Sequence, residues 1–249
     1  MNYVSLGYVC AIARELEKLG LRDSSMPFDW NVTNFEGVIK AINNKFSDYL
    51  EYEKLFQDAK CCKHYKNNDY DVQFFHDFNR FESLEKQLPL VQAKYNRRIK
   101  RFYDVIKERT IFVRYISDEN KVNGKSDELI WIENNYDYII SSLKFFNKEN
   151  DIIFIANEGV VSTKIKIFNV NKDKGDKITR RPITKNQEIK KLFDGQIDLK
   201  NKNLTRFNRK KIRLLKLLKC LFSLSFILKS IKLGFCRLCS KEYQHHQQY

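Results

Sequence analysis

The chain has 249 residues, of which 43% are hydrophobic and 31% charged, a composition typical of a globular protein and not of a disordered one. Its 8 glycines and 3 prolines are too few for a collagen-like, linker-like or turn-rich all-β protein, and its 6 cysteines are too few for a disulfide scaffold. The net charge of +15 is concentrated near the end of the sequence, because residues 201–249 carry 12 basic residues and one acid, whereas residues 1–200 carry 34 basic and 30 acidic residues. Nucleic-acid binding by the whole protein is therefore not expected.

Apolar patterns predict alternating strands and helices over the first 170 residues. The predicted strands cover residues 3–6, 72–75, 110–116, 151–156 and 164–170, with a short extended segment at 26–30. The predicted helices cover residues 9–19, 34–43, 83–108 and 127–146. We expect Gly20 to end the first helix, Thr33 to cap the second and Pro89 to restart or kink the third.

This alternation predicts a layered α/β domain over residues 1–170, with a mostly parallel central sheet flanked by helices. Residues 171–208 are polar, with little periodicity, and are expected to form a loosely ordered connector. Residues 209–249 are expected to form a basic helical tail, amphipathic because leucines and a phenylalanine share one face and basic residues the other.

Both ends of the sequence bear on where the protein is located in the cell. No signal peptide is expected in residues 1–10, and the longest uncharged run in the tail, residues 220–228, is too short to span a bilayer. We therefore expect a cytoplasmic protein with free thiols, and peripheral binding of residues 206–233 to the inner, anionic face of the membrane. The alternative is that the tail helix packs on the body of the protein.

The segment SLGYVC, residues 5–10, carries the first candidate for catalysis. A predicted strand turns at Gly7, and Cys10 falls in the first turn of the following helix, where unpaired backbone N–H groups and the helix dipole favour an anion. Such a position favours the thiolate, which is the nucleophilic form, and offers N–H donors to an oxyanion. The alternative is that Cys10 is a small, inert core residue.

A cysteine nucleophile needs a base, and His76 is the best candidate because it follows the apolar run VQFF at the end of a predicted strand. Asp77 or Asp29 could orient its ring. Asp77 is adjacent in sequence, and Asp29 is a carboxylate in the apolar segment PFDW, where it is expected to need a partner.

Three arginines are candidates either for binding an anion or for a structural role. Arg98 and Arg101 lie on the predicted helix segment RRIKRF, and Arg114 interrupts the apolar strand IFVRY. For Arg114 we favour a salt bridge, for instance with Asp29 or Asp77, because buried charges are normally paired.

No metal site and no cofactor are expected. Cys236, Cys239, His245 and His246 have only partial zinc-type spacing, and the group Cys61, Cys62 and His64 is weaker still.

Five segments in this order, SLGYVC, MPFDW, FFHDF, RRIKRF and FVRY, resemble a bacterial family described as "putative papain-like cysteine peptidases", over residues 3–160. The resemblance implies a Cys-His hydrolase, with the nucleophile at Cys10 and the base at His76, and its FDW and HDF acids match Asp29 and Asp77. It also implies a papain-like α+β fold as an alternative to the layered sheet.

Two functions follow from these observations. The first is a cysteine-nucleophile hydrolase or acyl transferase that acts on a peptide, an ester or a glycan-linked substrate. The alternative, suggested by the resemblance, is a non-peptidase protein of surface-polysaccharide metabolism that binds an anionic sugar or nucleotide through its arginines.

Overall fold

The computed structural model describes residues 1–58 and 61–194, which belong to a single compact unit. The tail helix, the membrane-binding segment and the last part of the expected connector therefore lie outside the described residues. No helix among the described residues is long and apolar enough to cross a bilayer.

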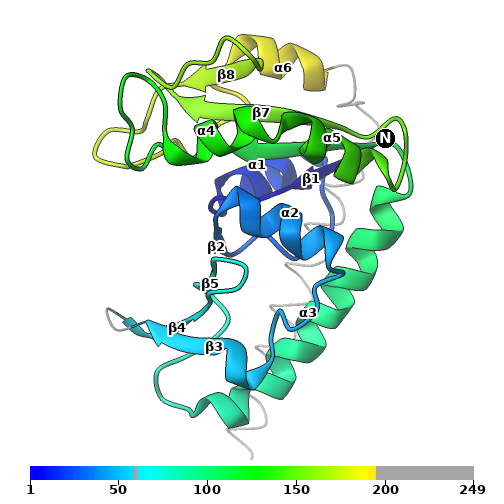
Figure 1. Cartoon of the computed structure of the whole chain (residues 1–249), viewed down its shortest axis with the longest axis vertical. Helices are drawn as coiled ribbons and strands as arrows, with labels where there is room; N and C mark the ends of the chain where they lie inside the picture. Colours follow the sequence, from blue (N-terminus) through cyan, green and yellow to red (C-terminus); the bar gives the residue numbers. More distant parts are fainter. Residues whose placement is uncertain (59–60, 195–249) are drawn as a thin grey trace, which may run out of the picture. The chain divides into compact units, whose positions relative to one another are not determined.

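A four-stranded parallel sheet lies between helices in the upper part of the view in Figure 1. Its strands, in spatial order, are β1 (Asn2–Ser5), β6 (Thr110–Tyr115), β7 (Asp151–Asn157) and β8 (Ile167–Val170). All three neighbouring pairs are parallel, and Val4 pairs with Phe112, which pairs with Ile152. The predicted α/β layer with a parallel central sheet is thus confirmed.

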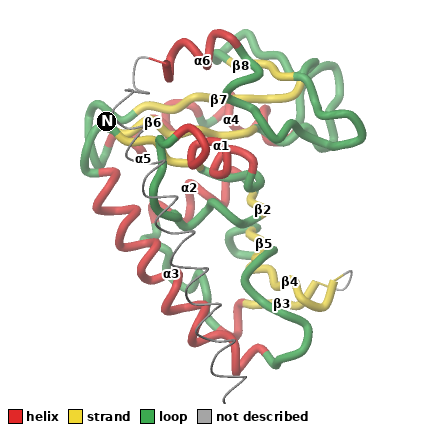
Figure 2. The backbone as a smooth tube through the Cα atoms, turned by 180° about the vertical axis from the view of Figure 1, so that it is seen from behind, coloured by secondary structure: helices red, strands yellow, loops and turns green. Residues whose placement is uncertain are grey.

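Helices cover both faces of this sheet. Two of them, α1 (Ala11–Leu19) and α6 (Gln187–Asp194), pack on the face formed by Val113, Tyr115 and Ile155, and Figure 2 shows α1 in front of the sheet from this side. The opposite face is covered by α2 (Phe35–Asn43), α3 (Leu84–Ile106), α4 (Asp127–Asn134) and α5 (Tyr136–Lys144). Strand residues alternate between the two cores because side chains of a strand point to opposite faces in turn.

A second, antiparallel sheet was not predicted. It contains, in spatial order, β2 (Val32–Thr33), β5 (Val72–Phe74), β4 (Cys61–Asn67) and β3 (Leu55–Asp58), with a 3₁₀ turn at Tyr52–Lys54 before β3. The strand expected at residues 72–75 is therefore present as β5, but it belongs to this sheet and not to the parallel one.

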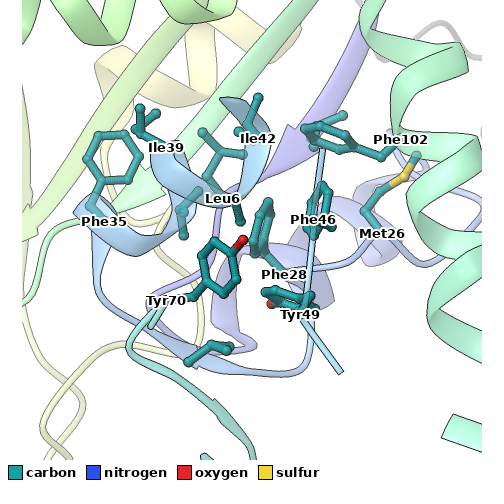
Figure 3. Packing of buried hydrophobic residues seen from close by; sticks show 14 of the residues in the cluster. Leu6, Met26, Phe28, Phe35, Ile39, Ile42, Phe46, Tyr49, Tyr70 and Phe102 are labelled. Atoms are coloured by element: carbon teal, nitrogen blue, oxygen red, sulfur yellow. The ribbon is translucent and has the colours of Figure 1, made fainter. Parts of the chain in front are cut away.

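Aromatic side chains fill the larger core, which lies between helix α2, helix α3 and the loop that follows α1 (Figure 3). The ring centroid of Phe28 lies 5.3 Å from that of Phe46 and 6.0 Å from that of Phe102. Pairs of this kind add about 0.5–1.5 kcal/mol to the stabilisation from burial. The segment that carries Phe28, residues 26–30, was expected to be extended but forms a turn at residues 27–30, where the Met26 N–H donates to the Asp29 carboxylate.

Several predicted helix ends are displaced. Asn34, and not Thr33, caps α2, since its side chain accepts a hydrogen bond from the Glu36 N–H at 2.9 Å. The helix predicted over residues 127–146 is two helices that meet at Asn135, whose backbone leaves the helical conformation with φ −120°. By contrast, α3 runs unbroken through Pro89, and Gly20 ends α1 in the left-handed conformation as expected.

Residues 171–194 are not a loosely ordered connector, contrary to expectation. They include α6, and Ile183, Ile189 and Phe193 are buried in the core next to α1. The Glu15 carboxylate accepts hydrogen bonds from the Ile183 N–H at 2.5 Å and from the Thr184 hydroxyl at 2.6 Å. A few well-placed apolar residues thus fix a segment whose average composition is polar.

Candidate functional site

The turn between β1 and α1 presents Cys10 at the start of the helix. Gly7 has φ +79°, and a Cβ at this position would lie 2.4 Å from Oγ1 of Thr33, so both conformation and space require glycine. Tyr8 follows with φ 34°, a strained value for an aromatic residue and one that is more frequent at functional sites. Cys10 is half-buried and is the N-cap residue of α1, where its carbonyl accepts from the Arg14 N–H at 3.0 Å.

His76 is exposed and follows β5. Its ring is nearly perpendicular to that of Trp30, with centroids 6.3 Å apart, and the Trp30 ring centroid lies 5.8 Å from the guanidinium carbon of Arg14. Arg14 is one helical turn beyond Cys10. Trp30 therefore contacts both the first turns of α1 and His76, and it is a site residue that the sequence did not single out.

The carboxylate of Asp77 is directed at α3. It pairs with Lys94, accepts a hydrogen bond from the Tyr95 hydroxyl at 2.8 Å, and lies 3.9 Å from Nη1 of Arg98. These contacts tie the segment that carries His76 to α3. Arg98 also lies 5.0 Å from the Tyr95 ring centroid.

Asp29 is fully buried, and its partner is Arg22. Oδ2 of Asp29 lies 2.5 Å from Nη1 of Arg22 and accepts from the Met26 N–H at 2.7 Å, whereas Oδ1 accepts no hydrogen bond from the described residues. Burial raises the pKa of Asp29 to about 6, although the Arg22 charge opposes this shift. The need for a partner was predicted, but Arg22 was not identified as that partner.

Arg114 is structural. It is completely buried, and its ion pair is with Glu128, not with Asp29 or Asp77 as suggested. Two of its N–H groups donate to Glu128, two to the side chain and carbonyl of Thr33, and one to the Leu6 carbonyl, all at 2.8 Å. A guanidinium has five N–H donors, so none is left for an anionic ligand. The anion-binding interpretation of Arg114 is therefore wrong.

Arg98 and Arg101 face a different environment. Nη1 of Arg101 donates to the Ser25 carbonyl at 2.6 Å, and both arginines line a depression beside the loop after α1. The structure thus separates the three candidate arginines into one fully buried structural residue and two that line this depression.

A polar cavity of about 340 Å³ lies at the carboxyl ends of β1 and β6 and next to β2 and β5. Carboxylates, amides and hydroxyls line most of it, among them those of Tyr8, Asn34, Asp71, Gln73, Ser117 and Glu119. Tyr8 connects this cavity to the turn that precedes Cys10, although Cys10 and His76 are not among the lining residues. Within the described ranges, no cluster of three or more His, Cys, Asp or Glu side chains could hold a metal ion.

Comparisons with known proteins relate most of the described chain to one family. A family model described as "Putative papain-like cysteine peptidase (DUF1796)" matches residues 1–146. The chain is also 32% identical over 178 residues to "Uncharacterized protein R408" of Acanthamoeba polyphaga mimivirus, an alignment that covers 62% of this chain and 77% of the viral protein. Because this relative is viral, the comparisons do not support the bacterial origin suggested for the family. No solved structure matches the chain significantly.

Proposed function

The chain belongs to the family described as "Putative papain-like cysteine peptidase", and on that premise we propose that it is a cysteine hydrolase with Cys10 as nucleophile and His76 as general base. The observation that carries the proposal is the position of Cys10, which caps α1 directly after the strained turn that follows β1. A strand, a sharp turn and a helix N-terminus present a nucleophile next to unpaired backbone N–H groups.

The proposed reaction is acyl transfer through the Cys10 thiol. His76 accepts the thiol proton, the sulfur attacks the acyl carbon, and the tetrahedral oxyanion accepts hydrogen bonds from the backbone N–H groups that begin α1. When the intermediate collapses, the bond to the leaving group breaks and His76 returns the proton to that group. Water, deprotonated by His76, then attacks the acyl carbon of the Cys10 thioester, the C–S bond breaks, and His76 returns the proton to the sulfur, which regenerates the thiol.

The contacts of Trp30 support the pairing of Cys10 with His76. Its ring centroid lies 6.3 Å from that of His76 and 5.8 Å from the guanidinium carbon of Arg14, which is one helical turn beyond Cys10, and it lies equally far from Arg22 after the end of α1. We expect Sγ of Cys10 and a ring nitrogen of His76 to lie within about 4 Å of each other, a limit that allows for the looser catalytic contacts of a free enzyme.

We assign positioning roles to the two acids. Asp77 holds the segment of His76 through its contacts with Lys94 and Tyr95 on α3. Asp29, paired with Arg22, fixes the turn before Trp30. A cytoplasmic, reducing location, as expected from the sequence, would keep Cys10 in the thiol state.

Steady-state assays of the full chain with ester, thioester and peptide substrates test the proposal. For the substrate class that is turned over, Cys10→Ala should lower kcat/KM by at least about 1,000-fold, and His76→Gln by roughly 100-fold or more. His64→Gln is the matched control and should change kcat/KM little. Equal activity of wild type and Cys10→Ala would contradict the proposal, as would inactivity of the wild type towards all three classes.

A further inference from the structure

A basic pocket lies between α3 and the loop after α1. Its volume is about 280 Å³, and its lining residues are Ser24, Ser25, Lys94, Arg97, Arg98 and Arg101. Every charged residue in this lining is a cation, so the pocket has the opposite character to the acid-rich polar cavity at the end of the parallel sheet.

The spacing of the four cations explains how they come together. Arg97 and Arg98 follow Lys94 by three and four residues, and Arg101 follows them by four and three, so all four side chains lie along one face of α3. Like charges at such spacings destabilise an isolated helix by a few tenths of a kcal/mol per pair. Counter-charges near this helix face reduce the repulsion.

The protein supplies only part of that counter-charge. Asp77 pairs with Lys94 and lies 3.9 Å from Arg98. Within the part of the chain that the structure describes, neither Arg97 nor Arg101 forms an ion pair, and Nη1 of Arg98 is buried without a hydrogen-bond acceptor. A buried guanidinium donor without an acceptor costs free energy, and such groups are rare in native proteins. These side chains therefore favour an anionic ligand.

We infer that this pocket binds the dianionic phosphate group of a phosphate monoester. Three arginines provide planar pairs of N–H donors that match phosphate oxygens, and the hydroxyls of Ser24 and Ser25 are further donors at the rim. A dianion compensates the excess positive charge better than a single carboxylate does.

The pocket adjoins the candidate catalytic residues. The Ser25 hydroxyl accepts a hydrogen bond from Nε1 of Trp30 at 3.2 Å, and Trp30 contacts His76. Lys94, on the pocket wall, pairs with Asp77, the residue after His76. The pocket thus selects phosphorylated acyl substrates for the hydrolase. This role in substrate selection rests on the proposed function. The binding of phosphate to the pocket is independent of that function.

Isothermal titration of the full chain with inorganic phosphate and with glycerol 3-phosphate, at fixed ionic strength, tests this inference. Saturable binding of both should weaken at least about tenfold in the Arg97→Gln/Arg101→Gln double variant. The matched control is Lys86→Gln/Lys100→Gln, which removes two cations from α3 outside the pocket and should change Kd less than twofold. Circular dichroism of each variant checks that the fold is retained.

The outcomes separate this inference from the proposed function. Cys10→Ala should bind both phosphates as tightly as wild type, because the pocket does not depend on catalysis. Equal weakening in the two double variants would overturn the inference, since it would indicate binding to the general positive charge. Binding of acetate as tightly as glycerol 3-phosphate would also overturn the inference. So would a protein that binds inorganic phosphate but not glycerol 3-phosphate.

Discussion

Asp29 shows how one buried carboxylate links stability to pH. Its side chain has no exposed surface, and the Arg22 charge offsets only part of the desolvation. The pKa in the folded protein is raised from 3.8 to about 6. Because folding raises this pKa, the contribution of Asp29 to stability is fully present below pH 3.8 and is lost as the pH rises through 6.

We therefore predict that the unfolding free energy of wild type, relative to Asp29→Asn, falls by about 2 kcal/mol between pH 4 and pH 7. The Asp29→Asn variant lacks the ion pair with Arg22 at every pH. This constant loss does not affect how the difference in unfolding free energy between the two proteins changes with pH. Urea denaturation of both proteins at several pH values measures it. Asp23→Asn removes an exposed carboxylate from the same loop and is the control. A difference that does not change with pH would contradict the prediction.

Buried charged residues also show the limit of prediction from sequence at this scale. The apolar surroundings of Asp29 and Arg114 correctly indicated that each needs a partner. The partners, Arg22 and Glu128, cannot be identified from the sequence, because many charged residues satisfy the same pairing rule. The sequence did not indicate that Trp30 belongs to the candidate site, since an aromatic residue in an apolar segment is equally typical of a core.

Among the helices, α2 depends on a glycine for its packing. A Cβ at Gly37 would lie 1.7 Å from the Tyr70 carbonyl oxygen and 2.5 Å from its carbon, so the helix contacts the turn before β5 directly. In an exposed helix, Gly→Ala stabilises by about 1 kcal/mol. For Gly37→Ala we predict a loss of stability instead, because the backbone of Tyr70 cannot move aside as a flexible side chain does.

Gly37→Ala should destabilise the protein by about 1–3 kcal/mol, the usual cost of overpacking. The shift in the urea midpoint measures this change. Gly175→Ala, where an added Cβ meets no atom within 4 Å, is the control, and only the cost of its positive φ, about 1 kcal/mol, is expected. An increase in stability for Gly37→Ala would show that α2 and the turn are not in contact.

The elements of the parallel sheet were predictable because they are apolar runs next to amphipathic helices. The antiparallel sheet was not, since β4 has the polar sequence CCKHYKN and β2 has only two residues. Neither strand has a pattern that distinguishes it from a loop. The candidate site was predictable in part for the same reason: Cys10 and His76 follow recognisable strands, whereas the basic pocket depends on how α3 packs against the loop after α1.

At the scale of the whole molecule, the concentration of positive charge in residues 201–249 favours peripheral association with an anionic surface. We propose that residues 206–233 bind peripherally to anionic membranes, with Leu214, Leu218, Leu221 and Phe222 inserted shallowly. Each basic residue near such a surface contributes up to about 1 kcal/mol, and salt screens this attraction over about 8 Å.

Sedimentation with anionic and neutral liposomes tests the role of the tail. The full chain should pellet with anionic liposomes at low salt and be released at high salt, whereas a chain that ends at Asn203 should stay in solution. Equal pelleting of the two proteins would contradict the prediction. Pelleting that persists in high salt and alkaline carbonate would indicate deeper insertion than we propose.

The central claim, an activated thiol at Cys10, is tested most directly by its rate of alkylation. The full chain is treated with iodoacetamide between pH 5 and pH 9, and the modified cysteines are mapped by mass spectrometry, for wild type and for His76→Gln. We predict that Cys10 reacts before the other cysteines below pH 7, and that the His76→Gln change slows this reaction. Uniformly slow labelling of Cys10 in both proteins would contradict the account.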